Sequence, residues 1–380
     1  MTHRPPERIV SAAIDRYLET LDHEELLVRR GRRSGLYSVV AVHSTARGPS
    51  LGGCRMWGYE DSRAAVRDAL RLSRAMTSKS AVAGLPLGGG KGVIMLPAGT
   101  APPGAALRRD ALLDFGDSVA QLGGRYITAE DVGTSDADMT VIAERTEHVA
   151  GLAIERGGSG DPSPWTALGV ETAIRVTCER VWGTGELAGR TIAVIGLGSV
   201  GGALARGLAA GGASLIVADV APGKRALADE LGARWAEPDE ALRAEADLVA
   251  PCALGGVLDH ATVPELRCRA VVGAANNQLA SDDVAAVLGA RGILWTPDFV
   301  ANAGGIINIA VELEPEGYAP DRARERVLAI GDTVRSVLDM AEADGTTPLA
   351  AAQELARRRL AEVGEEPRPA AQQAAVNGGL

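Results

Sequence analysis

Aromatic residues, histidines and cysteines are scarce in this chain of 380 residues. Phe, Trp and Tyr make up 3% of the sequence, so the hydrophobic cores must be built from Ala, Val, Leu and Ile. The five histidines show no HExxH or other metal-type spacing, and none of the four cysteines forms a CxxC pair. These absences argue against a metal site and against a disulfide framework, and we expect all four thiols to be reduced.

The chain also lacks long apolar runs and an excess of positive charge. No run of about 18 apolar residues occurs, so we expect no transmembrane helix and no membrane association. The first ten residues, MTHRPPERIV, contain no apolar signal core, which predicts a cytoplasmic protein. The net charge of −10 argues against a nucleic-acid binder, because such proteins normally present a basic face. The length is sufficient for two domains.

Two lysines and a cluster of glycines stand out at residues 76–95, MTSKSAVAGLPLGGGKGVIM. We predict a glycine-rich turn at which a small ligand can approach both the backbone and the ammonium of Lys91. A phosphate loop is excluded, because Leu85 stands where its first glycine belongs and Gly92 follows the lysine. A small carboxylate substrate fits Lys79 and Lys91, one lysine holding the carboxylate and the other doing chemistry. The alternative is two solvated lysines on a mobile loop.

The first 150 residues otherwise read as a mixture of helices and strands. Asp131 lies just beyond the strand predicted at residues 124–128, a common position for a catalytic acid in α/β sheets. The alternative is that Asp131 caps the following turn. The sequence also predicts a glycine-rich turn at 48–57, helices at 7–20, 62–76 and 105–122, and strands at 26–30 and 36–44.

The clearest element follows a Gly-, Pro- and Ser-rich segment, residues 151–164, which we interpret as a domain hinge. A helix is predicted at 164–182, and a buried strand pattern at 190–195 then leads into GLGSVG. This is the G-x-G-x-x-G fingerprint of a dinucleotide site, and a helix, a strand and Asp219 follow it. The helix N-terminus favours the pyrophosphate, and Asp219 is placed to accept hydrogen bonds from the adenosine ribose, which favours NAD over NADP. We therefore assign NAD binding to Gly196, Leu197, Gly198, Ser199, Val200, Gly201 and Asp219.

The remaining chain continues with alternating strands and helices. Strand patterns near 247–251, 270–273 and 292–295 end in turns that should meet at the carboxyl edge of a parallel sheet, where a nicotinamide would lie. Asn276, Asn277 and Asn302 follow these strands; the first two can serve a carboxamide or simply cap turns. Helices are predicted at 306–313, 322–343 and 348–363.

Taken together, the motifs resemble the glutamate/leucine/phenylalanine/valine dehydrogenase family. The matching stretches occur in the expected order from about residue 25 to 360. They are GPSLGGCRMW, MTSKSAVAGLPLGGGKGV, GRYITAEDVGTSDADM, GLGSVG, APCALGG, GAANNQL and PDFVANAGGIIN. The resemblance implies an N-terminal α/β substrate domain at 1–150, completed by helices within 346–380, and a Rossmann-type doubly wound NAD-binding domain at 151–345. It also implies a cleft between the two domains and a homo-oligomer.

The resemblance further implies roles for individual residues. Lys91 corresponds to the catalytic lysine and Asp131 to the acid that exchanges protons with the amino group. Lys79 corresponds to the lysine that binds the substrate α-carboxylate, near the backbone of Gly52 and Gly53. The remaining assignments are Asn276 to the substrate, and Asn277 and Asn302 to the cofactor. The implied reaction converts an L-amino acid, NAD⁺ and water reversibly to the 2-oxo acid, NADH and ammonium.

The choice of amino acid is expected to depend on side chains around the substrate. Glutamate-specific relatives carry a lysine at the position of Leu51 and a serine at that of Ile309, so glutamate is excluded here. Together with Ala129 and Ile306, these two residues are our candidates for the pocket wall, and they favour valine, leucine or isoleucine. Phenylalanine is the alternative, and a nucleotide-binding protein without catalysis is a third hypothesis.

Overall fold

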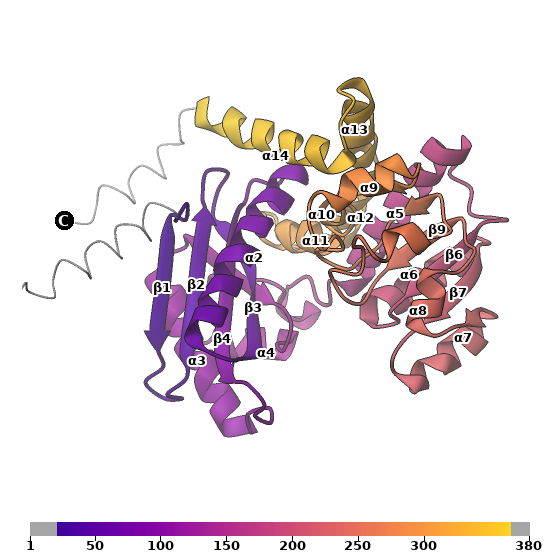
Figure 1. Cartoon of the computed structure of the whole chain (residues 1–380). Helices are drawn as coiled ribbons and strands as arrows, with labels where there is room; N and C mark the ends of the chain where they lie inside the picture. The colour runs from indigo at the N-terminus through magenta and orange to yellow at the C-terminus, as the bar shows by residue number, and fades with distance from the viewer. Residues whose placement is uncertain (1–20, 366–380) are drawn as a thin grey trace, which may run out of the picture. The chain divides into compact units, whose positions relative to one another are not determined.

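The computed structural model describes residues 21–365 (Figure 1). No helix of these residues is long and apolar enough to cross a membrane. The described chain divides into two compact units, which lie within residues 21–77 with 88–148 and within residues 78–87 with 149–365.

A five-stranded sheet forms the centre of the first unit, with the strand order β1-β2-β4-β3-β5. β2 runs antiparallel to both β1 and β4, whereas β4, β3 and β5 are parallel to one another. The strands are β1 (Glu25–Arg30), β2 (Tyr37–Ser44), β3 (Ser50–Tyr59), β4 (Gly88–Pro97) and β5 (Tyr126–Glu130).

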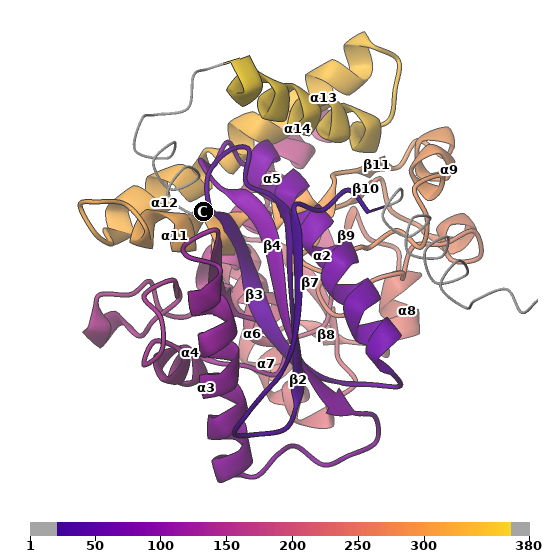
Figure 2. The same cartoon turned by 90° about the vertical axis from the view of Figure 1, so that its left-hand side faces the viewer.

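Helices cover both faces of this sheet. α2 (Ser62–Val82) lies on one face, and α3 (Ala105–Gln121) and α4 (Asp136–Ile142) lie on the other (Figure 2). Asp61 caps the N-terminus of α2, because its carboxylate accepts a hydrogen bond from the Ala64 N–H at 2.7 Å. α2 continues six residues beyond the predicted end at Met76, so Lys79 lies in its last turn rather than past it.

The two glycine-rich stretches predicted as turns are instead the neighbouring strands β3 and β4. Their glycines are needed because the surroundings leave no room for a side chain. A Cβ on Gly52 would lie 1.7 Å from the Gly90 carbonyl oxygen, and one on Gly92 would lie 2.4 Å from the Phe115 ring. The turn prediction was wrong because glycine usually marks turns, whereas here tertiary packing requires it within strands.

The second unit contains a six-stranded sheet with the order β11-β10-β9-β6-β7-β8, and every pair in it is parallel. The strand order reverses between β6 and β9, which is the Rossmann arrangement that the sequence predicted. In such sheets a ligand binds outside the carboxyl ends of the strands at this reversal. The strands are β6 (Thr191–Ile195), β7 (Ser214–Ala218), β8 (Arg234–Trp235), β9 (Leu248–Pro251), β10 (Ala270–Val271) and β11 (Leu294–Trp295).

The helices predicted in the second unit are present, but the one predicted at 322–343 is two helices, α12 (Pro320–Leu328) and α13 (Ile330–Ala343), which meet at Ala329. Four short helices were not predicted, namely α7 (Arg225–Leu231), α8 (Pro238–Leu242), α9 (Val284–Ala290) and α10 (Asp298–Ala301). The remaining helices are α5 (Ser163–Trp182), α6 (Ser199–Ala210), α11 (Gly304–Glu312) and α14 (Pro348–Glu365), with short 3₁₀ turns η1 (Ile154–Arg156), η2 (Pro222–Lys224) and η3 (Val263–Glu265).

Two predictions about the ends of the chain stay open. The helix predicted at 7–20 lies outside the described residues, as do residues 366–380. α14 belongs to the second compact unit, and its Leu349 lies in a hydrophobic cluster of that unit. The assignment of 346–380 to the substrate domain stays a prediction.

Candidate active site

Lys91 lies in the middle of β4 and is almost completely buried, with 5% of its surface exposed. The glycines on either side of it face closely packed neighbours. A Cβ on Gly89 would meet the backbone nitrogen of Thr77 at 2.1 Å, and one on Gly90 would meet the Tyr126 ring at 2.6 Å. The cluster therefore fixes the position of the lysine backbone within the sheet.

Asp131 directly follows β5 and forms an ion pair with the Lys91 ammonium through its Oδ2 atom. Its backbone is anchored by Thr134, whose Oγ1 accepts a hydrogen bond from the Asp131 N–H at 2.9 Å. The same hydroxyl donates to the Cys54 carbonyl at 2.8 Å. The tight turn between them requires Gly133, which has a φ of 83° and would place a Cβ 2.0 Å from the Met56 carbonyl oxygen. The carboxylate therefore faces Lys91, as the catalytic interpretation requires.

The charges around Asp131 keep it ionised. Burial raises the pKa of this carboxyl, but the positive charges of Lys91 and Arg55 outweigh burial and hold the pKa below its ordinary value. The side chain of the buried Lys91 thus lies against a half-buried carboxylate. Such a pair can move a proton to or from a substrate amino group or a water molecule.

Arg55 is a charged residue of this group that the sequence analysis did not select. Its Nε donates to the Asp131 Oδ2 at 3.3 Å, and its Nη1 donates to the Asp68 Oδ2 at 2.9 Å. The signal was present, since Arg55 lies in the quoted GPSLGGCRMW stretch. Its contact with Asp68 on α2 was not predictable, because it joins a strand to a separate helix.

Four other predicted residues lie near this pair in the first unit. Gly53 is opposite Ala129 in the β3–β5 ladder, and a Cβ on Gly53 would lie 2.7 Å from the Asp131 Cβ. Gly52 accepts a 2.5 Å hydrogen bond from the Tyr126 hydroxyl through its carbonyl. Leu51 is opposite Ile127, and its side chain is 1% exposed. Ala129 is likewise buried.

The predicted dinucleotide loop lies in the second unit between β6 and α6. Gly196 has a φ of 100°, and a Cβ there would meet Ala253 at 2.6 Å, so only glycine fits. A Cβ on Gly201 would lie 1.9 Å from the Gly196 carbonyl oxygen, which lets α6 pack close to the strand. Gly198 is the N-cap of α6, and a Cβ there would meet no atom of the described chain within 4 Å. The first turn of α6, which contains Ser199 and Val200, therefore begins next to open space at Gly198. This helix N-terminus has room for a pyrophosphate.

Asp219 follows β7 and stabilises this loop. Its Oδ2 accepts from the N–H of Leu197 at 2.6 Å, and its Oδ1 accepts from the N–H of Ala221 at 2.8 Å. The carboxylate is half-buried. It therefore lies beside the glycine loop, in the position where a ribose hydroxyl can donate to it.

Lys79, Asn276 and Asn302 form a second polar group, also in the second unit. The Asn276 Oδ1 accepts from the Lys79 ammonium at 3.3 Å and from the Asn302 Nδ2 at 2.9 Å. Asn302 is 5% exposed, and its Oδ1 has no hydrogen-bond partner among the described residues. A buried oxygen of this kind can accept a hydrogen bond from a ligand N–H.

The turn that carries Asn276 is supported by two buried residues, Gln278 and Asp298, that were not selected from the sequence. Asp298 accepts from the N–H of Gln278 at 3.0 Å and from that of Phe299 at 2.7 Å. Burial raises the pKa of Asp298 despite these hydrogen bonds and the charge of Lys79. Asn277 has a φ of 53°, the one positive value of a non-glycine residue in the described chain. The turn therefore has a fixed and partly strained backbone.

Two candidate pocket residues, Ile306 and Ile309, lie on α11 and are buried, with 7% of each exposed. The predicted site residues thus fall into two groups, one in each compact unit. The Lys91–Asp131 ion pair is in the first unit, whereas the predicted dinucleotide loop and the Lys79 group are in the second.

Comparison with known proteins identifies the family. Residues 24–148 match the family described as Glu/Leu/Phe/Val dehydrogenase, dimerisation domain, and residues 224–366 match Glutamate/Leucine/Phenylalanine/Valine dehydrogenase. The chain belongs to this dehydrogenase family. Residues 173–254 also match the NAD-binding domain of D-isomer specific 2-hydroxyacid dehydrogenases, so the chain contains an NAD-binding domain around the glycine loop.

Similar proteins in this family are named for aliphatic and aromatic amino acids. Leucine dehydrogenase from Bacillus cereus is 42% identical over 91% of this chain and 93% of its own length. Valine dehydrogenase from Streptomyces albus is 43% identical over 90% of this chain and 93% of its own length. L-tryptophan dehydrogenase from Nostoc punctiforme is a solved structure with a TM-score of 0.78 and 36% identity, matching 93% of this chain and all of that one.

Proposed function

We propose that this chain catalyses the NAD-dependent, reversible oxidative deamination of a branched-chain aliphatic L-amino acid. In the oxidative direction, the amino acid, NAD⁺ and water give the 2-oxo acid, NADH, ammonium and a proton. The observation that carries the proposal is the ion pair between the buried Lys91 and the half-buried Asp131 of this chain. The chain is 42% identical to a leucine dehydrogenase and 43% identical to a valine dehydrogenase.

In this proposal, Lys91 and Asp131 are the catalytic acid–base groups. Asp131, ionised at neutral pH, accepts a proton from the substrate ammonium and so frees the amine. Loss of hydride from the substrate Cα leaves an iminium, to which water then adds. In its neutral form, Lys91 accepts a proton from this attacking water. In its ammonium form, it stabilises the negative charge that develops on the carbinolamine oxygen. Burial strengthens these electrostatic effects, because less water screens them.

The second unit is proposed to bind the cofactor and the substrate carboxylate. The GLGSVG loop and Asp219 hold the dinucleotide, with Asn277 and Asn302 toward its nicotinamide end, and bound NAD⁺ supplies the hydride acceptor. Lys79 binds the α-carboxylate, and Asn276 orients its ammonium through the 3.3 Å hydrogen bond. The backbone of Gly52 and Gly53 is proposed to border the substrate.

The specificity is proposed to depend on aliphatic side chains, namely Leu51, Ala129, Ile306 and Ile309. None of the four can pair with a second carboxylate, so glutamate would leave a charge without a partner. Three of the four are bulky, which favours valine, leucine or isoleucine. Aromatic amino acids are the second candidate, supported by the 36% identity with a tryptophan dehydrogenase.

A substrate panel tests this proposal. NADH formation is measured by absorbance with valine, leucine, isoleucine, phenylalanine, tryptophan and glutamate, each with NAD and with NADP. We expect the highest kcat/KM with a branched-chain substrate and NAD. The highest value with an aromatic substrate would support the second candidate, and turnover of none of the six would contradict both.

We also propose that the protein works as a homo-oligomer in the cytoplasm. The match of residues 24–148 to a dimerisation domain supports the assembly. Light scattering coupled to size-exclusion chromatography gives the mass of the particle, which we expect to be a multiple of 39.2 kDa. A monomer at micromolar concentration would contradict this part of the proposal.

A further inference from the structure

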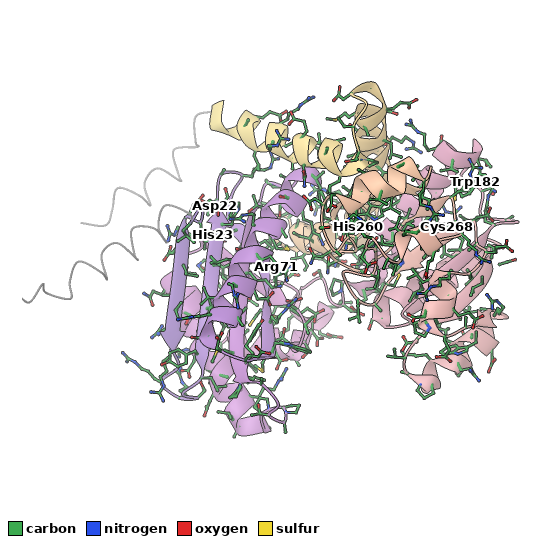
Figure 3. The ribbon with its side chains drawn as sticks, in the orientation of Figure 1. Asp22, His23, Arg71, Trp182, His260 and Cys268 are labelled. Atoms are coloured by element: carbon green, nitrogen blue, oxygen red, sulfur yellow. The ribbon has the colours of Figure 1, made fainter. Side chains whose placement is uncertain are left out.

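A row of alternating charges extends away from the catalytic pair within the first unit. Asp131 forms an ion pair with Arg55, and Arg55 forms a second ion pair with Asp68 on α2. Asp68 therefore lies on the side of Arg55 away from the Lys91–Asp131 pair. Asp68 also accepts from the Tyr59 hydroxyl at 2.7 Å and from the Arg71 Nη2 at 2.8 Å. Figure 3 labels Arg71, which α2 carries.

Arg55 is held at both ends, which makes it suited to orient another side chain. Its Nε contacts Asp131 and its Nη1 contacts Asp68, so the planar guanidinium cannot rotate without losing one partner. Its side chain is 22% exposed, compared with 15% for Asp68. Asp68 is itself fixed by donors from two elements, the strand that carries Tyr59 and the helix that carries Arg71.

The contact between Arg55 and Asp131 also affects Lys91. Arg55 and Lys91 donate to the same carboxylate oxygen, Oδ2, so one negative charge is shared between two cations. Lys91 is therefore less completely neutralised than in an isolated ion pair, and its ammonium retains more capacity to stabilise a substrate oxyanion.

We propose that Arg55 and Asp68 are positioning residues for the catalytic pair. Arg55 fixes the orientation of the Asp131 carboxylate against Lys91, and Asp68 fixes Arg55. Neither residue needs to contact the substrate. This inference rests on the proposed function, because it assigns Asp131 and Lys91 the acid–base roles described above.

The other titratable groups that face Asp131 do not compete with Arg55 for this role. The Cys54 thiol and the Tyr126 phenol are buried, and burial together with the charge of Asp131 raises the pKa of each well above its ordinary value. Both are therefore uncharged at neutral pH. Lys91 and Arg55 are the two cations that lower the pKa of Asp131, so removal of Arg55 should raise it.

The test compares Arg55→Gln, Arg55→Lys and Asp68→Asn with a matched control, Arg109→Gln. Arg109 forms an ion pair with Glu144 in the same unit, but its side chain is 51% exposed and is outside the charge row. Each variant is measured for kcat, for KM of the amino acid, for the pH profile of kcat/KM and for NAD binding by fluorescence quenching.

We expect Arg55→Gln to lower kcat by about 10²-fold, the usual effect of a small displacement of a catalytic group. KM should change less, because Arg55 does not hold the substrate. The acidic limb of the pH profile should move to higher pH, since Asp131 protonates more easily without the guanidinium. Arg55→Lys keeps the charge but cannot bridge both carboxylates, so it should restore part of kcat and leave the acidic limb near its wild-type position. Asp68→Asn should lower kcat less than Arg55→Gln.

A measurement independent of turnover separates this inference from the proposed function. In protein labelled with ¹³C at aspartate carboxyls, the Asp131 resonance is assigned by its absence in Asp131→Asn and then titrated. We expect it to titrate at higher pH in Arg55→Gln than in the wild type or in Arg109→Gln, whether or not any amino acid is turned over.

Specific outcomes would overturn the inference. They are an Asp131 titration that is unchanged in Arg55→Gln, or a kcat of Arg55→Gln within twofold of the wild type when the wild type is active. If Arg55→Gln does not fold, the same comparison is made with Arg55→Lys and Asp68→Asn. A wild-type kcat in both of these variants would then refute the positioning role. An inactive wild type whose Asp131 titration still responds to Arg55 contradicts the proposed function alone.

Discussion

Replacement of Gly52 by alanine is a stringent test of the packing between β3 and β4. The new Cβ would lie 1.7 Å from the Gly90 carbonyl oxygen and 3.2 Å from the Lys91 nitrogen. An ordinary contact between carbon and oxygen is about 3.3 Å, so the strands must separate by about 1.5 Å. Both partners are backbone atoms, and no change of rotamer relieves the clash. A shift of this size is enough to break hydrogen bonds of the ladder.

The expected effects follow from that displacement. Forced separation of packed elements costs about 3 kcal/mol or more, which corresponds to a fall in Tm of roughly 6–12 °C for a unit of this size. Lys91 is the residue next to Gly90, so it moves with the strand, and we expect kcat to fall by about 10²-fold. Differential scanning calorimetry and the NADH absorbance assay measure the two effects on the same preparation.

The matched control is Gly104→Ala, at the N-cap of α3. Gly104 has a φ of −60° and a ψ of 160°, and a Cβ there would meet no described atom within 4 Å. Its Tm should stay within about 2 °C of the wild type, since a substitution without a clash changes stability by about 0.5 kcal/mol. A Gly52→Ala protein with the Tm and kcat of the wild type would refute the close approach of β3 and β4.

Three further predictions concern other parts of the molecule. Lys91→Ala should lower kcat by at least about 10³-fold while NAD binding, measured by fluorescence quenching, is retained; near-normal turnover would contradict its catalytic role. Asp219→Ala should raise KM for NAD by about tenfold, because the carboxylate supports the glycine loop. It should also reduce the preference for NAD over NADP, because the carboxylate is proposed to bind the adenosine ribose. An unchanged ratio of kcat/KM with NAD to kcat/KM with NADP would argue against this role. Glu312→Ala should lower the free energy of unfolding, measured by urea titration, by about 3 kcal/mol. The reason is that the Glu312 carboxylate accepts hydrogen bonds from the N–H groups of Gly151 at 2.9 Å and Ser159 at 2.8 Å. The control, Glu316→Ala, should have little effect on this free energy.

The nucleotide half of the fold was predictable because its signals are local. A buried strand, the GLGSVG turn, a helix and Asp219 follow one another within about thirty residues, and the structure places them in that order. The two-residue strand β8 was missed, because Arg234 and Trp235 are too short a run to show any periodicity. The break at Ala329 was missed because no proline marks it, and the nearby Gly331 lies within α13 rather than at the end of a helix.

The first unit was less predictable because its decisive contacts are distant in sequence. Gly90 and Gly92 of β4 are explained by Tyr126 and Phe115, which come from other elements and fill the space next to them. Asp131 was selected from its place after a strand, and its ion pair with Lys91 agrees with that choice. Arg55 was quoted but not selected, because its importance depends on Asp68, which gives no signal of its own in the sequence.

The bare glycine backbone shared by β3 and β4 limits how the enzyme can be redesigned. Neither strand offers a side chain at Gly52, Gly90 or Gly92 that could be trimmed to admit a larger substrate, and any enlargement there moves the main chain instead. Mutant libraries directed at new amino acids should therefore leave these positions fixed and vary Leu51 and Ile309, the side chains proposed to set the specificity.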